Sequence, residues 1–177
     1  SEYFFEYKGP AATLYTPTPF LPETHEKDPD AAPLVTMIRT INETPADRFL
    51  DAVSPLVDVR AFVRQAAVEN FLADNDGLLG YAGMNNFYLY RSSSTRLSTF
   101  IPWDKSEAFK DPPDYTVWHN ILDVPNERQN RVVARALASD DLWSVLLTAL
   151  ADCVKSVSQL DPGDSRNWME REIDREY

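Results

Sequence analysis

One cysteine, five glycines and only 17 lysines and arginines stand in this chain of 177 residues, against 28 aspartates and glutamates. The single thiol, Cys153, excludes a disulfide within the chain, and we expect it to be a small buried hydrophobe in a helix. The formal net charge of -11 argues against general binding to nucleic-acid phosphates, which needs clustered Lys and Arg. No run approaches the roughly 20 apolar residues that a membrane helix needs, and the first residues lack the pattern of a signal peptide.

Motifs of several common enzyme classes are also missing. The sequence has no Gly-x-Ser-x-Gly elbow, no Cys/His pair and no Gly-x-x-x-x-Gly-Lys loop, which removes the common hydrolases and the P-loop enzymes. His25 and His119 have no His, Cys or carboxylate partner at ligand spacing, so neither supports a zinc site. We expect Lys8 and Lys105 to be solvated amines.

The first third of the chain predicts a strand, a long connection and then helices. Residues 2–8 are aromatic and alternate in the manner of a strand that ends at Gly9 and Pro10. Residues 11–33 are crowded with Pro, Thr and acidic residues and read as an extended connection. Helical spacing of apolar residues begins at Leu34, and a second helix is predicted from Thr44 and Pro45 through Val53.

The centre of the chain predicts a helix, a glycine-bearing loop and a hairpin. Asp58 caps a helix with one apolar face that ends near Asp74. Three of the five glycines follow in the loop 75–85, so its backbone needs unusual freedom. Two β-prone runs, 87–90 and 97–101, flank the polar turn 91–96, which is typical of a β-hairpin.

The remainder of the chain predicts helices. One begins at Pro125 and Asn126, and another begins at Asp140. A break at residues 161–163 precedes a last charged helix, 168–177. The expected fold class is therefore α+β and mostly helical, with one short antiparallel hairpin.

The order of these elements is typical of kinase-like phosphoryl-transfer sites. In such sites a helix leads to a loop with a carboxylate, an Asn follows, and a hairpin separates that Asn from a second carboxylate. Asn86 enters the first predicted strand and Asp104 leaves the second, so the hairpin brings together residues that lie 18 positions apart. As a pattern alone this is weak, because Asp and Asn are also common turn residues.

The same residues resemble the CotH (spore coat protein H) kinase family. The resemblance rests on the text VENFLADNDGLLGYAGMNNFYLYR and, after the turn, STFIPWDKSEAF. It implies that Asp76 is the catalytic base, that Asn86 is a metal ligand and that Asp104 is the principal metal ligand. Asp74 is the alternative to Asp76, and Asn85 is the alternative to Asn86. The cofactors that it implies are ATP and Mg²⁺ (or Mn²⁺).

The resemblance also implies how the chain is divided. It corresponds to the C-terminal lobe of an atypical protein kinase: residues 1–10 form a strand on the hinge side, 11–33 form the Pro-rich connection, and 34–177 form the helical lobe. Within that lobe, the catalytic loop is 74–86 and the hairpin is 86–104. The segment 126–131 resembles a helix start beyond the site. The N-terminal lobe, with its Gly-rich loop and phosphate-binding Lys, is expected to be absent from this chain.

Two functions follow, from different classes. The first is transfer of a phosphoryl group from Mg-ATP to Ser or Thr of a protein substrate, such as a coat or surface protein. The second is a catalytically silent kinase-like module that acts by binding proteins. It is favoured by one departure from the family pattern: Lys105 and Ser106 stand where many relatives continue Pro-Trp-Asp with a second carboxylate. We expect Trp103 to be a packing residue, and the family resemblance suggests an extracytoplasmic or cell-surface location.

Overall fold

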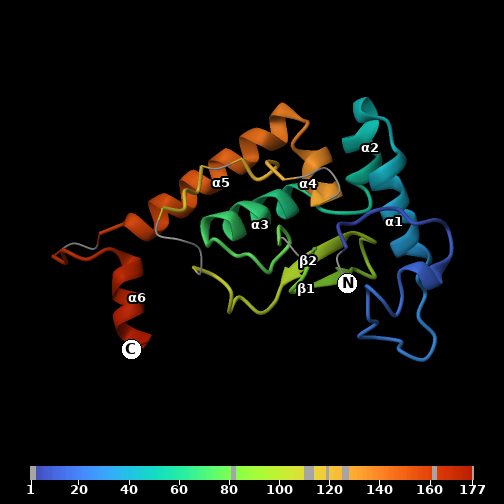
Figure 1. Ribbon diagram of the computed structural model, residues 1–177, viewed down its shortest axis with the longest axis horizontal. Helices are drawn as coiled ribbons and strands as arrows, with labels where there is room; N and C mark the ends of the chain where they lie inside the picture. Colours follow the sequence, from blue (N-terminus) through green and yellow to red (C-terminus); the bar gives the residue numbers. More distant parts are fainter. Residues whose placement is uncertain are drawn as a thin grey trace.

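The computed structural model describes residues 3–80, 83–109, 114–118, 120–124, 128–160 and 163–176, and it is an α+β structure in which helices predominate (Figure 1). Two short 3-10 helices are η1 (Ala12–Leu14) and η2 (Ala46–Arg48). The α-helices are α1 (Ala32–Glu43), α2 (Phe49–Val53), α3 (Val59–Phe71), α4 (Arg131–Ala136), α5 (Asp140–Ser158) and α6 (Trp168–Glu176). The strands are β1 (Phe87–Arg91) and β2 (Ser98–Pro102). This confirms the expected class.

Helix α3 is the centre of the fold. The carboxylate of Asp58 accepts a hydrogen bond from the backbone N–H of Ala61 at 2.9 Å, which confirms the predicted N-cap. Phe62, Val63 and Ala66 are buried on one face because apolar residues recur there at helical spacing. Helix α5 packs along α3, and the two form the long helical layer in Figure 1.

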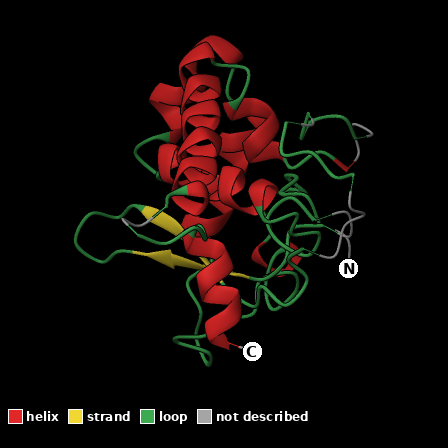
Figure 2. Cartoon of the chain, turned by 90° about the vertical axis from the view of Figure 1, so that its left-hand side faces the viewer, coloured by secondary structure: helices red, strands yellow, loops and turns green. Residues whose placement is uncertain are grey.

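The hairpin is the predicted one and forms the only sheet in the described part of the chain (Figure 2). Its strands are antiparallel, with Phe87 opposite Pro102 and Arg91 opposite Ser98. Phe100 points into the core, where the centroid of its ring lies 4.7 Å from that of the Phe62 ring and 5.2 Å from that of the Phe87 ring. The backbone of Ser98 bonds to Leu56 and Asp58, so the hairpin is attached to the start of α3.

The N-terminal segment is buried without being a strand. The strand expected over residues 2–8 is not formed in the described residues 3–8, which make single hydrogen bonds instead of a ladder. The N–H of Met84 donates to the carbonyl of Tyr3 at 2.7 Å, and the N–H of Arg131 donates to that of Phe4 at 3.0 Å. The rings of Tyr3 and Phe5 lie in the core. The aromatic residues of this segment therefore indicate that it is buried, and not that it pairs in a sheet.

The connection 11–33 is mostly exposed and is organised by one buried side chain. The hydroxyl of Tyr15 accepts the N–H of Lys8 at 2.6 Å and donates to the carbonyl of Gly9 at 3.0 Å. Lys8 itself is exposed, as expected, and its ammonium lies 4.8 Å from the centre of the Tyr3 ring. Helix α1 begins at Ala32, before the predicted start, because Pro33 is tolerated in a first helical turn.

Helices α1 and α4 are joined by Arg135. Its guanidinium donates to the carbonyls of Ile41, at 2.9 Å, and Asn42, at 2.7 Å, and also to that of Thr44. These carbonyls end α1 and have no partner within the helix. The helix predicted from Thr44 to Val53 is split into η2 and α2, and Thr44 is instead the C-cap of α1, with its N–H bonded to the carbonyl of Thr40 at 3.2 Å.

The C-terminal helices differ in their surroundings. Asn130 caps α4 by accepting the N–H groups of Val132 and Val133 at 2.9 and 3.2 Å. The predicted start at Pro125 and Asn126 lies outside the described residues. Helix α5 begins at Asp140 as predicted, and α6 carries exposed ion pairs such as Arg166–Asp174. Among the described helices, none is both long and apolar enough to cross a membrane. The division into 1–10, 11–33 and 34–177 stays a prediction.

Candidate functional site

The loop after α3 is built around a buried glutamate. Glu69 is 1% exposed, and its Oε2 accepts the N–H of Leu78 at 2.6 Å. The loop passes so close to this carboxylate that a Cβ on Gly77 would collide with it and would lie 2.9 Å from Asp74 Oδ2. A side chain at residue 77 would therefore force the Glu69 and Asp74 carboxylates to move.

Lys105 pairs with both buried carboxylates of this loop. Its ammonium donates to Glu69 Oε1 at 2.9 Å and to Asp74 Oδ2 at 2.8 Å, and both carboxylate side chains are fully buried. Burial alone would lower the pKa of Lys105, but the hydrogen bonds and charges of Asp74 and Glu69 outweigh it and raise that pKa. The expectation that Lys105 is a solvated amine is wrong.

Asp76 is held by the two asparagines at the start of β1. The side-chain N–H groups of Asn86 lie 2.8 Å from Asp76 Oδ2 and 2.8 Å from its carbonyl oxygen, and Asn85 donates to Asp76 Oδ1 at 2.9 Å. Asn86 has a positive φ of 51°, a conformation that Asn tolerates better than most residues. The structure thus brings Asp76 and Asn86 into contact.

Asp104 lies at the same end of the hairpin. The N–H of Trp103 donates to the carbonyl of Asn86 at 2.8 Å, which continues the pairing one step beyond the strands. Asp104 follows with a positive φ of 37°, its side chain is exposed, and its Oδ1 accepts the N–H of Ser106 at 3.2 Å. The hairpin therefore places the Asp104 turn beside Asn86, while the roles of Asp76, Asn86 and Asp104 stay predictions.

Asp74, the alternative to Asp76, and Trp103, the expected packing residue, have different surroundings. Asp74 is 5% exposed and is occupied by Lys105 and by the N–H of Asp76, at 3.1 Å, so its carboxylate is less accessible than that of Asp76. Trp103 is 58% exposed and meets the Tyr88 ring edge-on at 5.6 Å, so it packs only on the outer face of the hairpin.

The donor atoms suit a hard divalent cation. Asp104 offers carboxylate oxygens, and the side-chain N–H groups of Asn86 are bonded to Asp76, which leaves the side-chain Oδ1 of Asn86 as the donor suited to a cation. No cluster of three or more His, Cys, Asp and Glu able to hold a metal occurs among the described residues. The expected ligands, the Asp104 carboxylate and the Asn86 side-chain amide, fit Mg²⁺ that takes its other ligands from phosphates and water.

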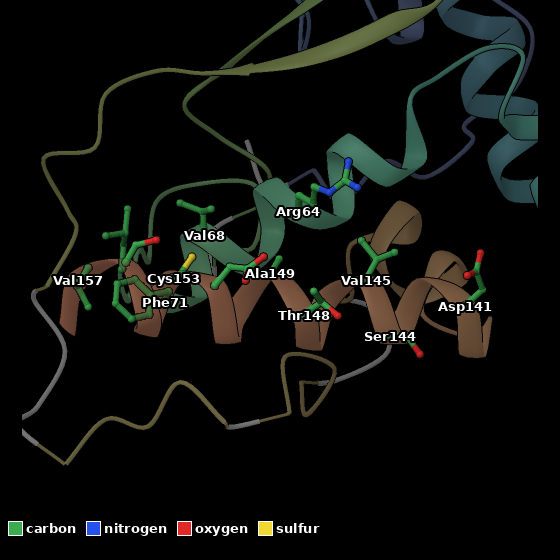
Figure 3. Close-up of a pocket in the computed structure, with 13 residues that line it drawn as sticks. Arg64, Val68, Phe71, Asp141, Ser144, Val145, Thr148, Ala149, Cys153 and Val157 are labelled. Atoms are coloured by element: carbon green, nitrogen blue, oxygen red, sulfur yellow. The ribbon is translucent and has the colours of Figure 1, made fainter. Parts of the chain in front are cut away.

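A large cavity lies away from these residues. It is an open, mainly apolar groove of about 640 Å³ between α3 and α5 (Figure 3), with Val68, Phe71 and Val145 on its walls. Cys153 lies in it and is half-buried, and burial together with the charge of Asp152 raises the pKa of the thiol. The groove contains neither Asp76 nor Asp104.

A smaller cavity adjoins the Asp76 loop. It measures about 140 Å³ and is bounded by Glu69, Asp74 and Asn75 on one side and by Tyr115, Asn120 and Asp123 on the other. Tyr115 fixes that second wall by donating its hydroxyl to the carbonyl of Asn70 at 2.6 Å. Unlike the larger groove, this cavity is lined by Asp74 and Asn75, the residues that lead to Asp76.

Sequence reasoning missed Glu69 and the partnership of Lys105. One signal was available for Glu69: it lies three residues after Ala66 and seven after Phe62, on the buried face of α3. A carboxylate on a buried face needs a partner. No comparable signal identified Lys105, because its partners lie 36 and 31 positions away in the sequence.

The chain was compared with known proteins. Residues 12–155, well over half of the chain, match the family described as CotH kinase protein. The match begins after the buried N-terminal segment and covers the Asp76 loop, the hairpin and Asp104. No curated protein matches the chain. The extent of the family match shows that the chain belongs to the CotH kinase family, whose members are kinase-like proteins.

Proposed function

We propose that this chain supplies the catalytic and metal-binding residues of a protein kinase with a kinase-like C-terminal lobe. The reaction is transfer of the γ-phosphoryl group of ATP to a Ser or Thr hydroxyl. One observation carries the proposal: Asn86 holds the Asp76 carboxylate with its side chain and the Trp103 N–H with its carbonyl oxygen. A single residue thus joins the loop of the expected base to the turn of the expected metal ligand.

Asp76 would accept the proton of the attacking hydroxyl. Its carboxylate is half-buried and is oriented from both oxygens, by Asn85 on Oδ1 and by Asn86 on Oδ2. A carboxylate that is oriented in this way is suited to positioning a hydroxyl, and phosphoryl transfer depends mainly on positioning and charge.

Asp104 and Asn86 would hold Mg²⁺ (or Mn²⁺). When bound, Mg-ATP supplies the phosphoryl group, and its cation neutralises the charge on the phosphates. The exposed carboxylate of Asp104 and the side-chain Oδ1 of Asn86 are hard donors on adjoining segments. The net charge of -11 suits a basic protein substrate by complementarity. The family resemblance points to coat or surface proteins.

Phosphate transfer by the natural protein that carries this sequence tests the proposal. Labelling from ATP is measured with Mg²⁺ or Mn²⁺, on a basic and an acidic Ser/Thr protein, for wild type, Asp104→Ala, Asp76→Asn and the matched surface variant Asp51→Ala. We expect Asp104→Ala and Asp76→Asn each to lower the rate about 100-fold or more, because a group that stabilises the transition state is lost. Asp76→Asn should retain ATP binding.

The alternative function is a silent binding module. Ser106 favours it, because it offers no second carboxylate after Asp104, and its N–H occupies one oxygen of Asp104. An absence of labelling by folded wild-type protein with both substrates and both cations would favour the module. Full activity in Asp76→Asn or Asp104→Ala would remove that residue from the mechanism.

A further inference from the structure

Lys105 connects two segments of the site that are distant in the sequence. Its ammonium reaches Glu69 at the end of α3 and Asp74 at the start of the loop, at 2.9 and 2.8 Å. Its backbone follows directly on Asp104. The ion bridge therefore runs from the turn of the expected metal ligand to the loop of the expected base.

The loop side of this bridge is rigidly defined. Asp74 Oδ1 accepts the N–H of Asp76, and Glu69 Oε2 accepts the N–H of Leu78. Gly77 lies against both carboxylates with no room for a side chain. Any movement of the Asp74 and Glu69 carboxylates would therefore move the backbone on both sides of Gly77.

The turn side of the bridge is fixed at its two ends. The N–H of Trp103 is bonded to the carbonyl of Asn86 at 2.8 Å, and that of Phe109 to the carbonyl of Leu72 at 2.8 Å. Between these two bonds, the Lys105 ammonium links the turn to the loop through its side chain. The strained backbone of Asp104, with φ of 37°, sits next to this link.

We propose that Lys105 is a positioning residue: its ammonium, seated on Glu69 and Asp74, fixes Asp104 relative to Asp76 and so sets the affinity of the site for a divalent cation. The cation half of this inference rests on the proposed function. In this proposal Lys105 acts through Asp104 and does not itself bind substrate or cation, since its ammonium is held by two buried carboxylates.

A merely structural role predicts a different outcome. Two buried carboxylates need a cation, so removing Lys105 destabilises the fold in either case. A variant in which Glu69, Asp74 and Lys105 are all neutral separates the structural role of Lys105 from its positioning role. In Glu69→Gln/Asp74→Asn/Lys105→Met the acceptors for the N–H groups of Leu78 and Asp76 are kept, and no buried charge is left unpaired, but the turn loses its link to the loop.

The first measurement is the binding of Mn²⁺ alone to the full chain. Electron paramagnetic resonance reports the concentration of free Mn²⁺, at a temperature well below the melting temperature of every variant. Binding that survives Asp104→Ala is non-specific and is subtracted. We expect the triple variant to bind at least about tenfold more weakly than wild type. Lys105→Arg, which keeps the charge, should recover part of the affinity. The exposed control Lys155→Met should bind as wild type does.

Amide hydrogen exchange is the second measurement and needs no metal. In the triple variant we expect the N–H groups of Trp103 and Phe109 to exchange at least about tenfold faster, and the capped N–H of Val132 in α4 to be unchanged. Unchanged exchange at Trp103 and Phe109 would overturn the positioning role. Wild-type Mn²⁺ affinity in the triple variant would overturn the cation half. If wild type shows no Asp104-dependent Mn²⁺ binding, the cation half and the proposed metal site both fail, and exchange alone decides the positioning role.

Discussion

Phe100 and Lys105, close together in the chain, enter two interiors of different chemistry. Phe100 joins a cluster of aromatic rings, with centroids 5.8 Å from Phe5 and 4.7 Å from Phe62. Lys105 joins two buried carboxylates. An apolar interior tolerates exchanges that conserve volume, whereas the ionic centre is defined by hydrogen-bond geometry and cannot lose one member without leaving a buried charge. The aromatic side supplies stability, and the ionic side supplies position.

The largest expected effect tests this difference between the interiors directly. Lys105→Met should lower the free energy of unfolding by about 3–5 kcal/mol, because it leaves the Glu69 and Asp74 carboxylates buried without a cation. Met37→Leu, an apolar exchange in the core of α1, should cost less than about 1.5 kcal/mol. Urea denaturation followed by circular dichroism measures both, and equal losses would erase the distinction.

A smaller effect sharpens the claim that the ionic centre is closely fitted. Gly77→Ala should lower the free energy of unfolding by about 1–3 kcal/mol, because its methyl group meets the Glu69 and Asp74 carboxylates and they must move. The control is Ser93→Ala in the exposed hairpin turn, which should stay within about 0.5 kcal/mol of wild type. If Gly77→Ala is as stable as the control, the loop accommodates the methyl group without a steric clash, and the ionic centre is not closely fitted.

The smallest effect concerns the aromatic interior and its dependence on pH. Burial, together with the charges of Tyr15 and Glu6, raises the pKa of Tyr3. The unfolded ring loses its proton near pH 10 while the folded ring keeps it, so this stability is present below about pH 10 and is lost as the pH rises above it. Tyr3→Phe should cost about 1 kcal/mol at pH 7, through loss of the bond to the Glu6 carbonyl.

Above pH 10 the Tyr3→Phe protein should lose stability with pH less steeply than wild type does. Denaturation midpoints from pH 7 to 11 give the two slopes, with the exposed Tyr90→Phe as the control. Parallel slopes for all three proteins would show that Tyr3 ionises normally in the fold.

The helices and the hairpin could be predicted because their signals are local. Asp58 followed by apolar residues at helical spacing predicts a capped helix, and two β-prone runs around a polar turn predict the hairpin. Whether residues 2–8 form a strand could not be decided from a local signal. Tyr3 and Phe5 are aromatic because they enter the core, and a strand and an irregular buried segment show the same pattern over so few residues.

In the candidate site, too, local contacts could be predicted from the sequence and long-range contacts could not. The contact of Asp76 with Asn86 follows from a loop that runs into a strand, and the register of the hairpin places Asp104 nearby. The roles of these residues rest on the family. The partnership of Lys105 depends on where α3 lies relative to the turn, which is tertiary information that no local pattern contains.

The two main-chain hydrogen bonds of the N-terminal segment bear on how the protein is made. The carbonyl of Tyr3 is joined to Met84 in the site loop, and that of Phe4 is joined to Arg131 at the start of α4. During synthesis the first partner leaves the ribosome well before the second. The nascent chain can therefore assemble the loop and the hairpin on the N-terminal segment early. The bond between Phe4 and Arg131 can form only after the start of α4 has emerged from the ribosome, because both residues that it joins must be present.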